Sequence, residues 1–364
     1  MRAPSIQAFE RSARPGWRAC IDLIARRKCA LAIGIFVIAF AGPGLGFSAS
    51  EILPGFQAPR QFGTIFEPSG VQQLPDGRIL VVEDEKLNPI KILTLSQDGE
   101  ILAEPVLSAS LLDMVTGKPT LGKMEDLEGV DIDDNGYVYA ITSHSRTDSG
   151  KRDRSRERLV RFKVDGSKIV EPRAARQLKK KIVKKHRVLK DAVGVFDVKK
   201  DGGLNIEGLS FDKSKKRLLI GLRSPVIDTK AVIVVMENPD AVFENGAKPK
   251  ISDDLIYLDL KKGGIRGIAF DPRLKGYLIL SRREDKTNKS FKLWFWDGDP
   301  AHAPRKIKTP HSDDLDNAEG VTPIRLFGQD RILIVSDDGN TNKRTGAHYL
   351  LLTYEQLEID SISN

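Results

Sequence analysis

Five positions of the chain share one sequence context, and acidic residues occupy three of them. Glu128, Glu207 and Glu319 each stand directly before a glycine that opens an apolar, strand-like segment. Arg266 and Ser69 take the same place in two further copies of the pattern. The glycines lie at positions 70, 129, 208, 267 and 320, so the copies are 59, 79, 59 and 53 residues apart. Such a period indicates a repeated structural unit, and equivalent positions of a closed ring of units face one axis.

Carboxylates that converge on an axis repel one another and lose hydration, so one must be protonated or a positive group must compensate them. Calcium is the best match, because it is satisfied by oxygen ligands alone and tolerates irregular geometry. We therefore predict Ca²⁺ as the cofactor, with Glu128, Glu207 and Glu319 as its ligands.

If each copy is a β-hairpin, the start of its first strand lies beside the end of its second strand. The glutamates then share one rim with the polar residues around the ends of the second strands: Glu83, Asp84, Ser143, His144, Arg146, Arg223, Arg282, Arg283, Asp337 and Asp338. From this neighbourhood we predict the ligand-binding residues Arg266, Arg146, Asp126 and Asp337. In an enzymatic form, Ca²⁺ polarises a phosphoryl or acyl ester, His144 is the general base, and Arg223 stabilises developing negative charge.

The positive groups allow other interpretations of the same ring. Arg266, Arg223 and His144 can neutralise it directly, or bind an anionic ligand that bridges a metal. The plainer interpretation is a polar network that ties neighbouring repeats together and binds nothing. From the residues alone, all of these stay open.

Other kinds of catalytic site find no support in the sequence. The five histidines show no metal-ligand spacing, and no Gly-x-Ser-x-Gly motif is present. Both cysteines, Cys20 and Cys29, lie near the N-terminus, which leaves the rest of the chain without thiolate ligands or disulfides. We expect no zinc, nicotinamide, flavin or haem cofactor.

The elements that must position these residues are strands. Each copy has two apolar strands separated by a turn rich in Asp, Asn, Pro and Gly, and several copies are followed by further strands. About four short strands per unit are typical of a propeller. We predict an all-β chain folded as a β-propeller with five blades, in which residues 54–66 complete the last blade. Six blades are the alternative, because the 79-residue interval has room for another blade around a candidate strand at 193–199.

One segment does not fit the all-β pattern. Residues 151–190 hold 17 basic and 4 acidic residues, and within them the run RQLKKKIVKKHRVLK (176–190) places its apolar residues on one helix face. We predict a basic helical insertion at 170–190. A basic amphipathic helix favours contact with an anionic membrane or a polyanion, and a solvated surface insertion is the alternative.

The N-terminus has the features of an export leader. Seven basic and two acidic residues precede the apolar run 29–47, which is broken by Pro43 and nearby glycines. We predict that residues 1–50 are a signal peptide removed before Glu51. The alternative is an uncleaved inner-membrane anchor at 29–47, because the run is nearly long enough to span a bilayer. Residues 51–364 then form a single β-propeller domain in the periplasm or the extracellular space.

The formal net charge of +8 misdescribes this predicted domain. Without residues 1–50 and 151–190, the chain has 34 basic and 44 acidic residues. An acidic, exported domain is not expected to bind nucleic acid. We expect a monomer whose partners are a small polar or anionic ligand and, through the basic insertion, a membrane surface or an envelope protein.

A series of strings resembles a bacterial propeller family known only as a domain of unknown function. The strings are EDLEGVDIDDNGYVYAITSHSR (125–146), NIEGLSF (205–211), LLIGLRSP (218–225), GIRGIAF (264–270), LWFWDG (293–298), AEGV (318–321) and SDDG (336–339). The family is distantly similar to phytase-like esterase and gluconolactonase-type propellers, and this resemblance implies metal-dependent hydrolysis at the channel mouth. It places the site at Glu128, Glu207 and Glu319, with Arg266 standing where a further carboxylate is expected.

The arginine in that place weakens a fully acidic calcium cage, and the family has no established reaction to transfer. We therefore predict an extracytoplasmic propeller that binds a small polar or anionic ligand at the channel mouth, with Ca²⁺, and has the means to hydrolyse an ester or phosphoester. Whether it is an enzyme stays open. The alternative is a non-catalytic envelope scaffold or interaction protein.

Overall fold

The computed structural model describes most of the chain after the N-terminal region. The described residues are 58–84, 89–95, 101–105, 121, 123–195, 202–283 and 290–361. The chain divides into two units, Met1–Ala49 and Ser50–Asn364, and the described residues all belong to the second. The predicted leader and its cleavage site therefore lie outside the described residues. Within the described ranges, no helix has both the length and the apolar character needed to cross a bilayer.

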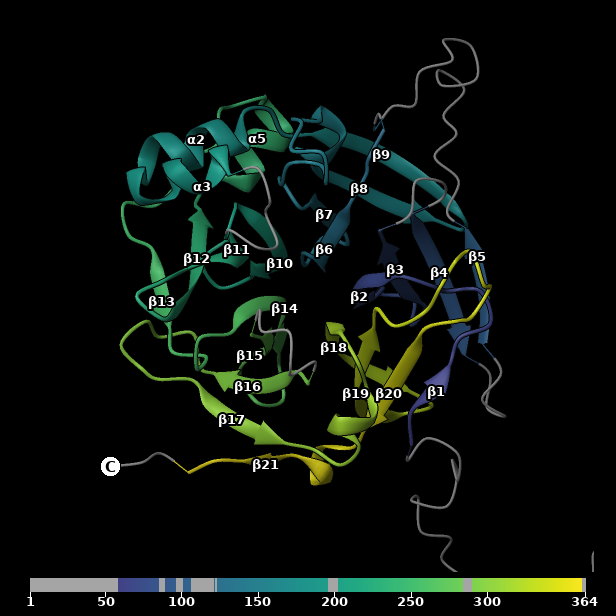
Figure 1. Ribbon diagram of the computed structural model, residues 1–364. Coiled ribbons are helices and arrows are strands. Elements are labelled where there is room, and N and C mark those ends of the chain that lie inside the picture. The colour runs from purple at the N-terminus through teal and green to yellow at the C-terminus, as the bar shows by residue number, and fades with distance from the viewer. Residues whose placement is uncertain are drawn as a thin grey trace, which may run out of the picture. The chain divides into compact units, whose positions relative to one another are not determined.

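The described strands form five antiparallel sheets arranged in a ring (Figure 1). Blade 1 contains β2 (Pro68–Gln73), β3 (Ile79–Glu83), β4 (Ile90–Leu95) and β5 (Ile101–Pro105). Blade 2 contains β6 (Leu127–Ile132), β7 (Val138–Thr142), β8 (Leu159–Asp165) and β9 (Lys168–Ala174). Blade 3 contains β10 (Asn205–Asp212), β11 (Arg217–Ile227), β12 (Lys230–Met236) and β13 (Ile256–Leu258).

The last two blades also take strands from the ends of the described chain. Blade 4 contains β14 (Gly264–Asp271), β15 (Gly276–Arg282), β16 (Lys292–Trp296), β17 (Arg305–Lys308) and β21 (Glu358–Ile359). Blade 5 contains β18 (Ala318–Leu326), β19 (Gln329–Ser336), β20 (His348–Leu352) and β1 (Arg60–Gln61). The prediction of an all-β propeller with five blades is confirmed, and the six-blade alternative is wrong for the described part of the chain.

The ring is closed by the N-terminal segment, as the sequence predicts. Strand β1 pairs with β20 through Arg60 opposite Tyr349 and Gln61 opposite His348. The next residue, Phe62, is buried, and its ring centroid lies 4.6 Å from that of Tyr349. Strand β1 comes from the segment before blade 1 and completes blade 5, so its contacts add to the packing between the inner strands of these two blades.

The blades pack face to face, and this explains the dense apolar runs of the repeats. All five residues of β3 and of β7 are buried, because each strand is covered on both faces by its neighbours. The repeated glycines allow the inner strands to approach closely. A Cβ atom at Gly129 would lie 2.9 Å from the Cβ of Leu209, and one at Gly208 would lie 2.8 Å from Ile265.

The basic insertion is helical and lies between blades 2 and 3. It consists of α2 (Leu178–Lys185), the 3₁₀ turn η3 (Arg187–Leu189) and α3 (Lys190–Gly194). Residues 170–174 of the predicted insertion belong instead to the outer strand β9, so the helical part starts later than predicted. The candidate strand at 193–199 is wrong in its first two residues, which end α3, and its residues 196–199 lie outside the described ones.

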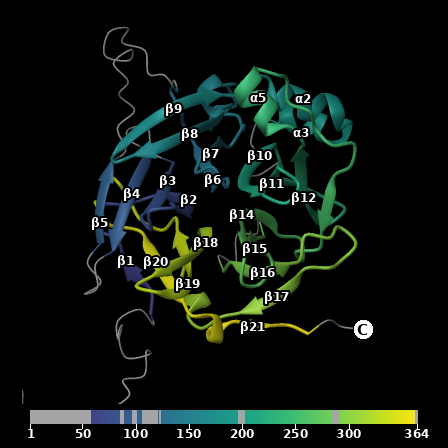
Figure 2. The ribbon, with the colours of Figure 1, turned by 180° about the vertical axis from the view of Figure 1, so that it is seen from behind.

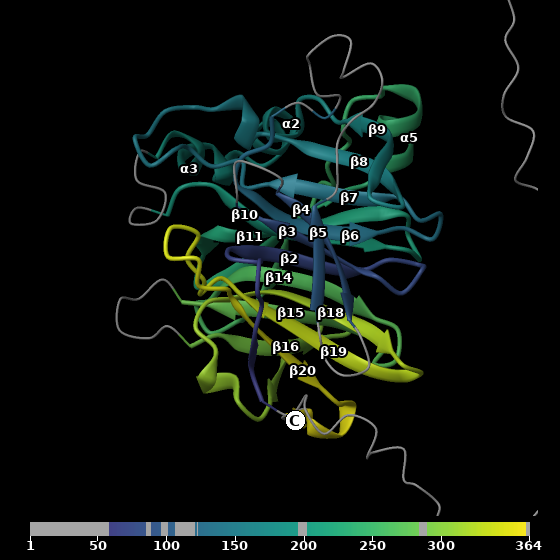
Figure 3. The ribbon, with the colours of Figure 1, turned by 90° about the vertical axis from the view of Figure 1, so that its right-hand side faces the viewer.

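The helices cover the outer edge of blade 3, beside α5 (Pro239–Asn245), as Figures 1 and 2 both show. Figure 3 shows the blades from the side, with the helices again at that edge. Leu178, Ile182 and Leu189 are buried in the same apolar cluster as the strands of blade 3. Three further 3₁₀ turns are η2 (Arg154–Arg156), η4 (Ser312–Asp314) and η5 (Tyr354–Gln356).

Removal of the Phe62 ring tests the closure. Phe62→Ala is expected to lower the free energy of unfolding by about 3–5 kcal/mol, because it leaves a cavity beside Tyr349. Urea unfolding of the purified chain measures the change. Phe327→Ala, at a phenylalanine that is 38% exposed, is the control and should change stability far less. Equal effects of the two substitutions would contradict a closing role for Phe62.

Candidate functional site: a glutamate ring on the propeller axis

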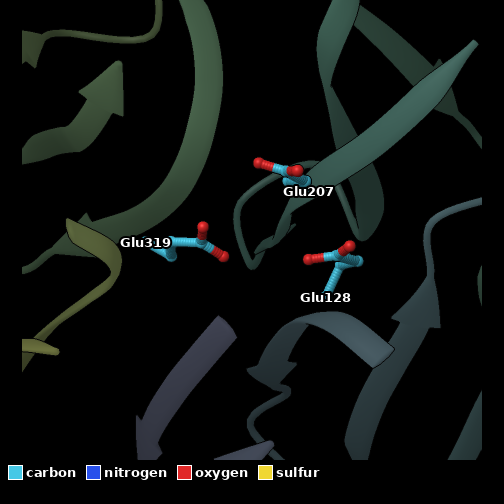
Figure 4. A group of neighbouring side chains, drawn as sticks. All are labelled: Glu128, Glu207 and Glu319. Carbon is cyan, nitrogen blue, oxygen red and sulfur yellow. The ribbon is translucent and has the colours of Figure 1, made fainter. Parts of the chain in front are cut away.

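Glu128, Glu207 and Glu319 lie together where three inner strands begin. They are held by β6, β10 and β18, and each side chain is at most 6% exposed. One carboxylate oxygen from each can be chosen so that all three lie within 4.8 Å of one another. Figure 4 shows the three carboxylates turned toward a common centre. We call this group the glutamate ring.

A β-bulge places each of these side chains. In all five hairpins, the pairing between the first two strands is regular after the repeated glycine and shifts at the residue before it. The shifted residues are Ser69, Glu128, Glu207, Arg266 and Glu319. A bulge leaves one residue unpaired and turns its side chain out of the regular alternation. The sequence identifies these positions through the repeat but gives no sign of the bulge itself.

Arg266 compensates two of the three glutamates. Its Nη1 lies 3.0 Å from Oε2 of Glu207, and its Nη2 forms an ion pair with Glu319. Arg223 adds a second positive group at 2.7 Å from Oε1 of Glu207, and Asn205 donates a hydrogen bond of 3.1 Å to the same oxygen. Burial lowers the pKa of Arg266 to about 10, so its guanidinium stays charged at neutral pH.

Glu128 is the member of the ring without an ion pair among the described residues, and the charge of Arg266 only partly offsets the factors that raise its pKa. Its carboxylate has no hydrogen bond or ion pair with any residue that the structure describes. Burial raises its pKa well above the usual value, and the nearby carboxylates of Glu207, Asp126 and Asp84 raise it further. With three carboxylates and two guanidinium groups, the ionised ring has a surplus of one negative charge. Either a proton on Glu128 or a bound cation removes that surplus.

The space between the inner strands is small. The cavity lined by the glutamate ring and the repeated glycines holds about 10 Å³, which is room for one water molecule or one ion. An organic ligand does not fit there, so any such ligand must lie outside this cavity.

A second cluster of charged residues adjoins the ring. Asp126 forms an ion pair with Arg156 and accepts a hydrogen bond of 3.2 Å from Ser145. Burial raises the pKa of Asp84 to about 8, and the neighbouring Asp126 contributes to this rise. Sequence reasoning identified both aspartates and missed Arg156. That arginine lies in the strongly basic segment, where its charge looks like surface charge, and only the packing brings it to Asp126.

Two predicted residues are turned toward the helical insertion. His144 is buried, its Nδ1 donates to the Thr142 carbonyl at 2.8 Å, and its own carbonyl accepts a hydrogen bond from Lys179. Burial lowers the pKa of His144 to about 4, so the imidazole is neutral at pH 7. Arg146 donates to the carbonyl oxygens of Val193 and Gly150. Among the described residues, neither side chain forms a hydrogen bond or ion pair with the glutamate ring.

The last predicted residue, Asp337, lies directly after β19, where its backbone pairs with Asn317. The Asp337 N–H donates to the Asn317 carbonyl at 2.9 Å, and the Asn317 amide donates to the Asp337 carbonyl at 3.0 Å. The structure therefore brings Arg223 and Arg266 into contact with the glutamate ring, and it places Asp126 beside the ring.

Five antiparallel sheets around an axis that carries a buried glutamate ring define a five-bladed β-propeller. Residues 167–352 match the model of a family described as "Protein of unknown function (DUF3616)". The match covers half of the chain, so the chain belongs to this family, and the resemblance found in the sequence is confirmed. None of the curated proteins matches the chain.

Several solved structures are similar to the chain. The PQQ domain of pyranose dehydrogenase from Coprinopsis cinerea is 10% identical, with 84% of this chain and 86% of that chain covered and a TM-score of 0.40. A gluconolactonase from Xanthomonas campestris is 14% identical, with 78% and 71% covered and a TM-score of 0.38. The allergen Mala s 1 from Malassezia sympodialis is 12% identical, with 82% and 80% covered and a TM-score of 0.39. No statement about function follows from these likenesses.

The raised pKa of Glu128 predicts a pH-dependent stability. The folded state holds this proton more tightly than the unfolded state, so in calcium-free buffer the free energy of unfolding should fall as the pH rises above about 4.5. The slope is about 1.4 kcal/mol per pH unit until the folded pKa is reached. Glu128→Gln should remove this contribution, as measured by urea unfolding between pH 5 and 8.

The control is Glu355→Gln, at a side chain that is 75% exposed, which should keep the wild-type slope. An unchanged slope in Glu128→Gln would show that Glu128 is ionised in the folded protein without a cation.

Proposed function

We propose that the chain is an exported propeller that binds one divalent cation, Ca²⁺, at the glutamate ring and holds a small anionic ligand at the channel mouth. The observation that carries the proposal is the carboxylate of Glu128. It is buried, converges on two other carboxylates, and has no partner among the described residues. A buried carboxylate in that situation must hold a proton or accept a cation.

The donor atoms around the ring fit a calcium ion. All are oxygens. Asn205 Oδ1 is a buried acceptor without a hydrogen-bond donor in the described part of the chain, and Glu207 Oε2 has only the Arg266 guanidinium against it. The cavity has room for one ion. Arg266 opposes binding, because its positive charge lies against two of the ligands. We therefore expect a dissociation constant in the range of weak extracellular sites, about 10⁻⁴–10⁻³ M.

The anionic ligand follows from the charges at the mouth. A bound cation would make the ring net positive, and the side chain of Arg223 is 11% exposed, while that of Arg266 is only 3% exposed. An anion entering from solvent would therefore meet the cation and Arg223 first. The guanidinium group binds carboxylates and phosphates through two parallel hydrogen bonds.

The hydrolytic form of the proposal needs a general base in addition. Ca²⁺ would supply Lewis-acid polarisation of an ester or phosphoester. His144 is neutral at pH 7 and so able to accept a proton, but its described contacts lead to Thr142 and Lys179 and not to the ring. The geometry therefore supports ligand binding better than hydrolysis.

Calcium titration with thermal melting tests the cation site. The wild-type chain should gain about 2.7 kcal/mol of stability at a free Ca²⁺ concentration one hundred times the dissociation constant. Glu128→Gln should lose most of this gain. Arg266→Gln should be less stable by about 3–5 kcal/mol without calcium, because it leaves buried carboxylates uncompensated. It should then gain more from calcium than the wild type does.

Glu355→Gln is again the control and should respond to calcium as the wild type does. If the wild type gains nothing and Arg266→Gln stays equally unstable with and without calcium, the ring is a structural network and the proposal fails. A panel of lactones and phosphoesters, tested with and without calcium and with Arg223→Gln, then separates binding from hydrolysis.

Export predicts a processed N-terminus. When the full chain is produced in a Gram-negative host, the periplasmic product should begin at Glu51, as mass spectrometry of the intact protein measures. Ser50→Phe should block processing, because the cleavage site requires small residues. A wild-type product that keeps residues 1–50 and stays with the inner membrane would support the anchor alternative.

A further inference from the structure

A second candidate site lies between the helical insertion and the segment that joins β7 to β8. It is a cavity of about 860 Å³, within the range of small-molecule sites. The residues that line it are Arg146, Arg152, Glu157, Lys179, Lys180, Val183, Lys184, Arg187, Lys190 and Val193. We call it the basic cavity. None of its residues belongs to the glutamate ring, so the inference below does not depend on the proposed function.

The basic cavity has a large surplus of positive charge. Seven lining residues are cationic and one, Glu157, is acidic. That carboxylate is already engaged, since it lies 2.6 Å from Arg152 and 2.9 Å from Lys179. Although burial opposes the change, these two partners lower the pKa of Glu157 to about 2. Among the described residues, Arg146 donates to two backbone carbonyls and forms no ion pair with a carboxylate.

Four of the cations have no acidic partner. Lys180, Lys184, Arg187 and Lys190 form no ion pair with any residue in the described ranges. Lys180 and Lys184 are four residues apart on α2 and so lie on the same helix face, where like charges repel. Held around one cavity, such charges favour a bound anion, since it relieves their mutual repulsion.

The fold fixes this arrangement. Leu178 and Ile182 anchor one face of α2 in the core, and Leu189 anchors η3. The basic face of α2 therefore cannot turn away from the cavity without exposing the apolar face. For the same reason, α2 has no free apolar face to insert into a bilayer, as a membrane-surface helix requires. These packing contacts therefore favour binding of an anion in the cavity over insertion of the helix into a membrane surface.

We propose that the basic cavity binds a compact ligand with several clustered phosphate groups. The seven cations and one carboxylate of the lining give it a net charge of +6, which matches about three phosphate groups, each with a charge near −2 at neutral pH. Lysine and arginine side chains are the usual phosphate ligands in proteins. The phosphates can belong to a soluble molecule or to the headgroup of a lipid, and the experiment distinguishes these sources.

Calorimetric titration of the full chain with inorganic tripolyphosphate, in calcium-free buffer, tests the proposal. One molecule should bind per chain. The double variant Lys184→Gln with Arg187→Gln should weaken binding by at least about tenfold, because it removes two charge-assisted contacts. Both side chains are exposed and lie among like charges, so the melting temperature should not fall.

The matched control is Lys181→Gln with Lys248→Gln, which removes the same charge from positions that do not line the cavity. This control should keep wild-type affinity. Glu128→Gln should also bind tripolyphosphate normally, which separates the basic cavity from the glutamate ring. Absence of binding would overturn the proposal. Equal weakening in both double variants would also overturn it, because it would mean that tripolyphosphate is attracted nonspecifically to surface charge.

Flotation with phosphatidylcholine vesicles that contain phosphatidylinositol bisphosphate, whose headgroup carries clustered phosphates, identifies the source of the phosphates. Flotation that tripolyphosphate competes away, and that the Lys184 and Arg187 substitutions abolish, assigns the site to a lipid headgroup. Tripolyphosphate binding without flotation assigns it to a soluble polyphosphate. Flotation that survives those substitutions, without tripolyphosphate binding, would contradict a phosphate site in the cavity.

Discussion

Five inner strands meet at the propeller axis, and near its start each has a residue that a β-bulge removes from regular pairing. The glycine after that residue lets neighbouring strands approach until a single added carbon would collide with the next blade. These two features leave a space on the axis for about one water molecule or ion. The side chains at the bulge positions must therefore provide hydrogen bonds and opposite charges for one another. Their net charge determines which ion the space between them favours.

The charges on the axis are close to balanced but unevenly distributed. Arg266 bridges Glu207 and Glu319, and Arg223 adds a second contact on Glu207. Glu128 forms no ion pair within this network, and the charges of Glu207, Asp126 and Asp84 outweigh the opposing effect of Arg266 on its pKa. A purely structural network would gain by neutralising all three glutamates, since a lone buried carboxylate is costly. The lack of an ion-pair partner for Glu128 is therefore the observation that favours the proposed cation site over a purely structural network between the blades.

The repeat made much of this predictable from the sequence. Equivalent positions in a ring share one environment, so aligning five glycines was enough to place the glutamates and Arg266 on one axis. A β-bulge is defined by how two strands pair, so the sequence of one strand does not reveal it. The rim prediction treated His144 and Arg146 as the end of a simple hairpin. The backbone of His144 is left-handed, with φ of 56°, and the segment that then leads to β8 contacts the helical insertion, so Arg146 lines the basic cavity.

The positive and negative charges lie in different parts of the molecule, so the net charge of the whole chain does not describe either candidate site. The chain is basic overall, yet outside residues 1–50 and 151–190 it is acidic, and the structure keeps these opposite charges in different places. Near the axis, the charges of the carboxylates and the guanidinium groups largely cancel. The electrostatic attraction for an anion is therefore weak there until a cation binds. In the basic cavity, apolar anchors hold uncompensated cations side by side, and their repulsion is present before any ligand arrives. The cavity is thus preorganised for an anion, whereas the ring must first take up a cation to attract one.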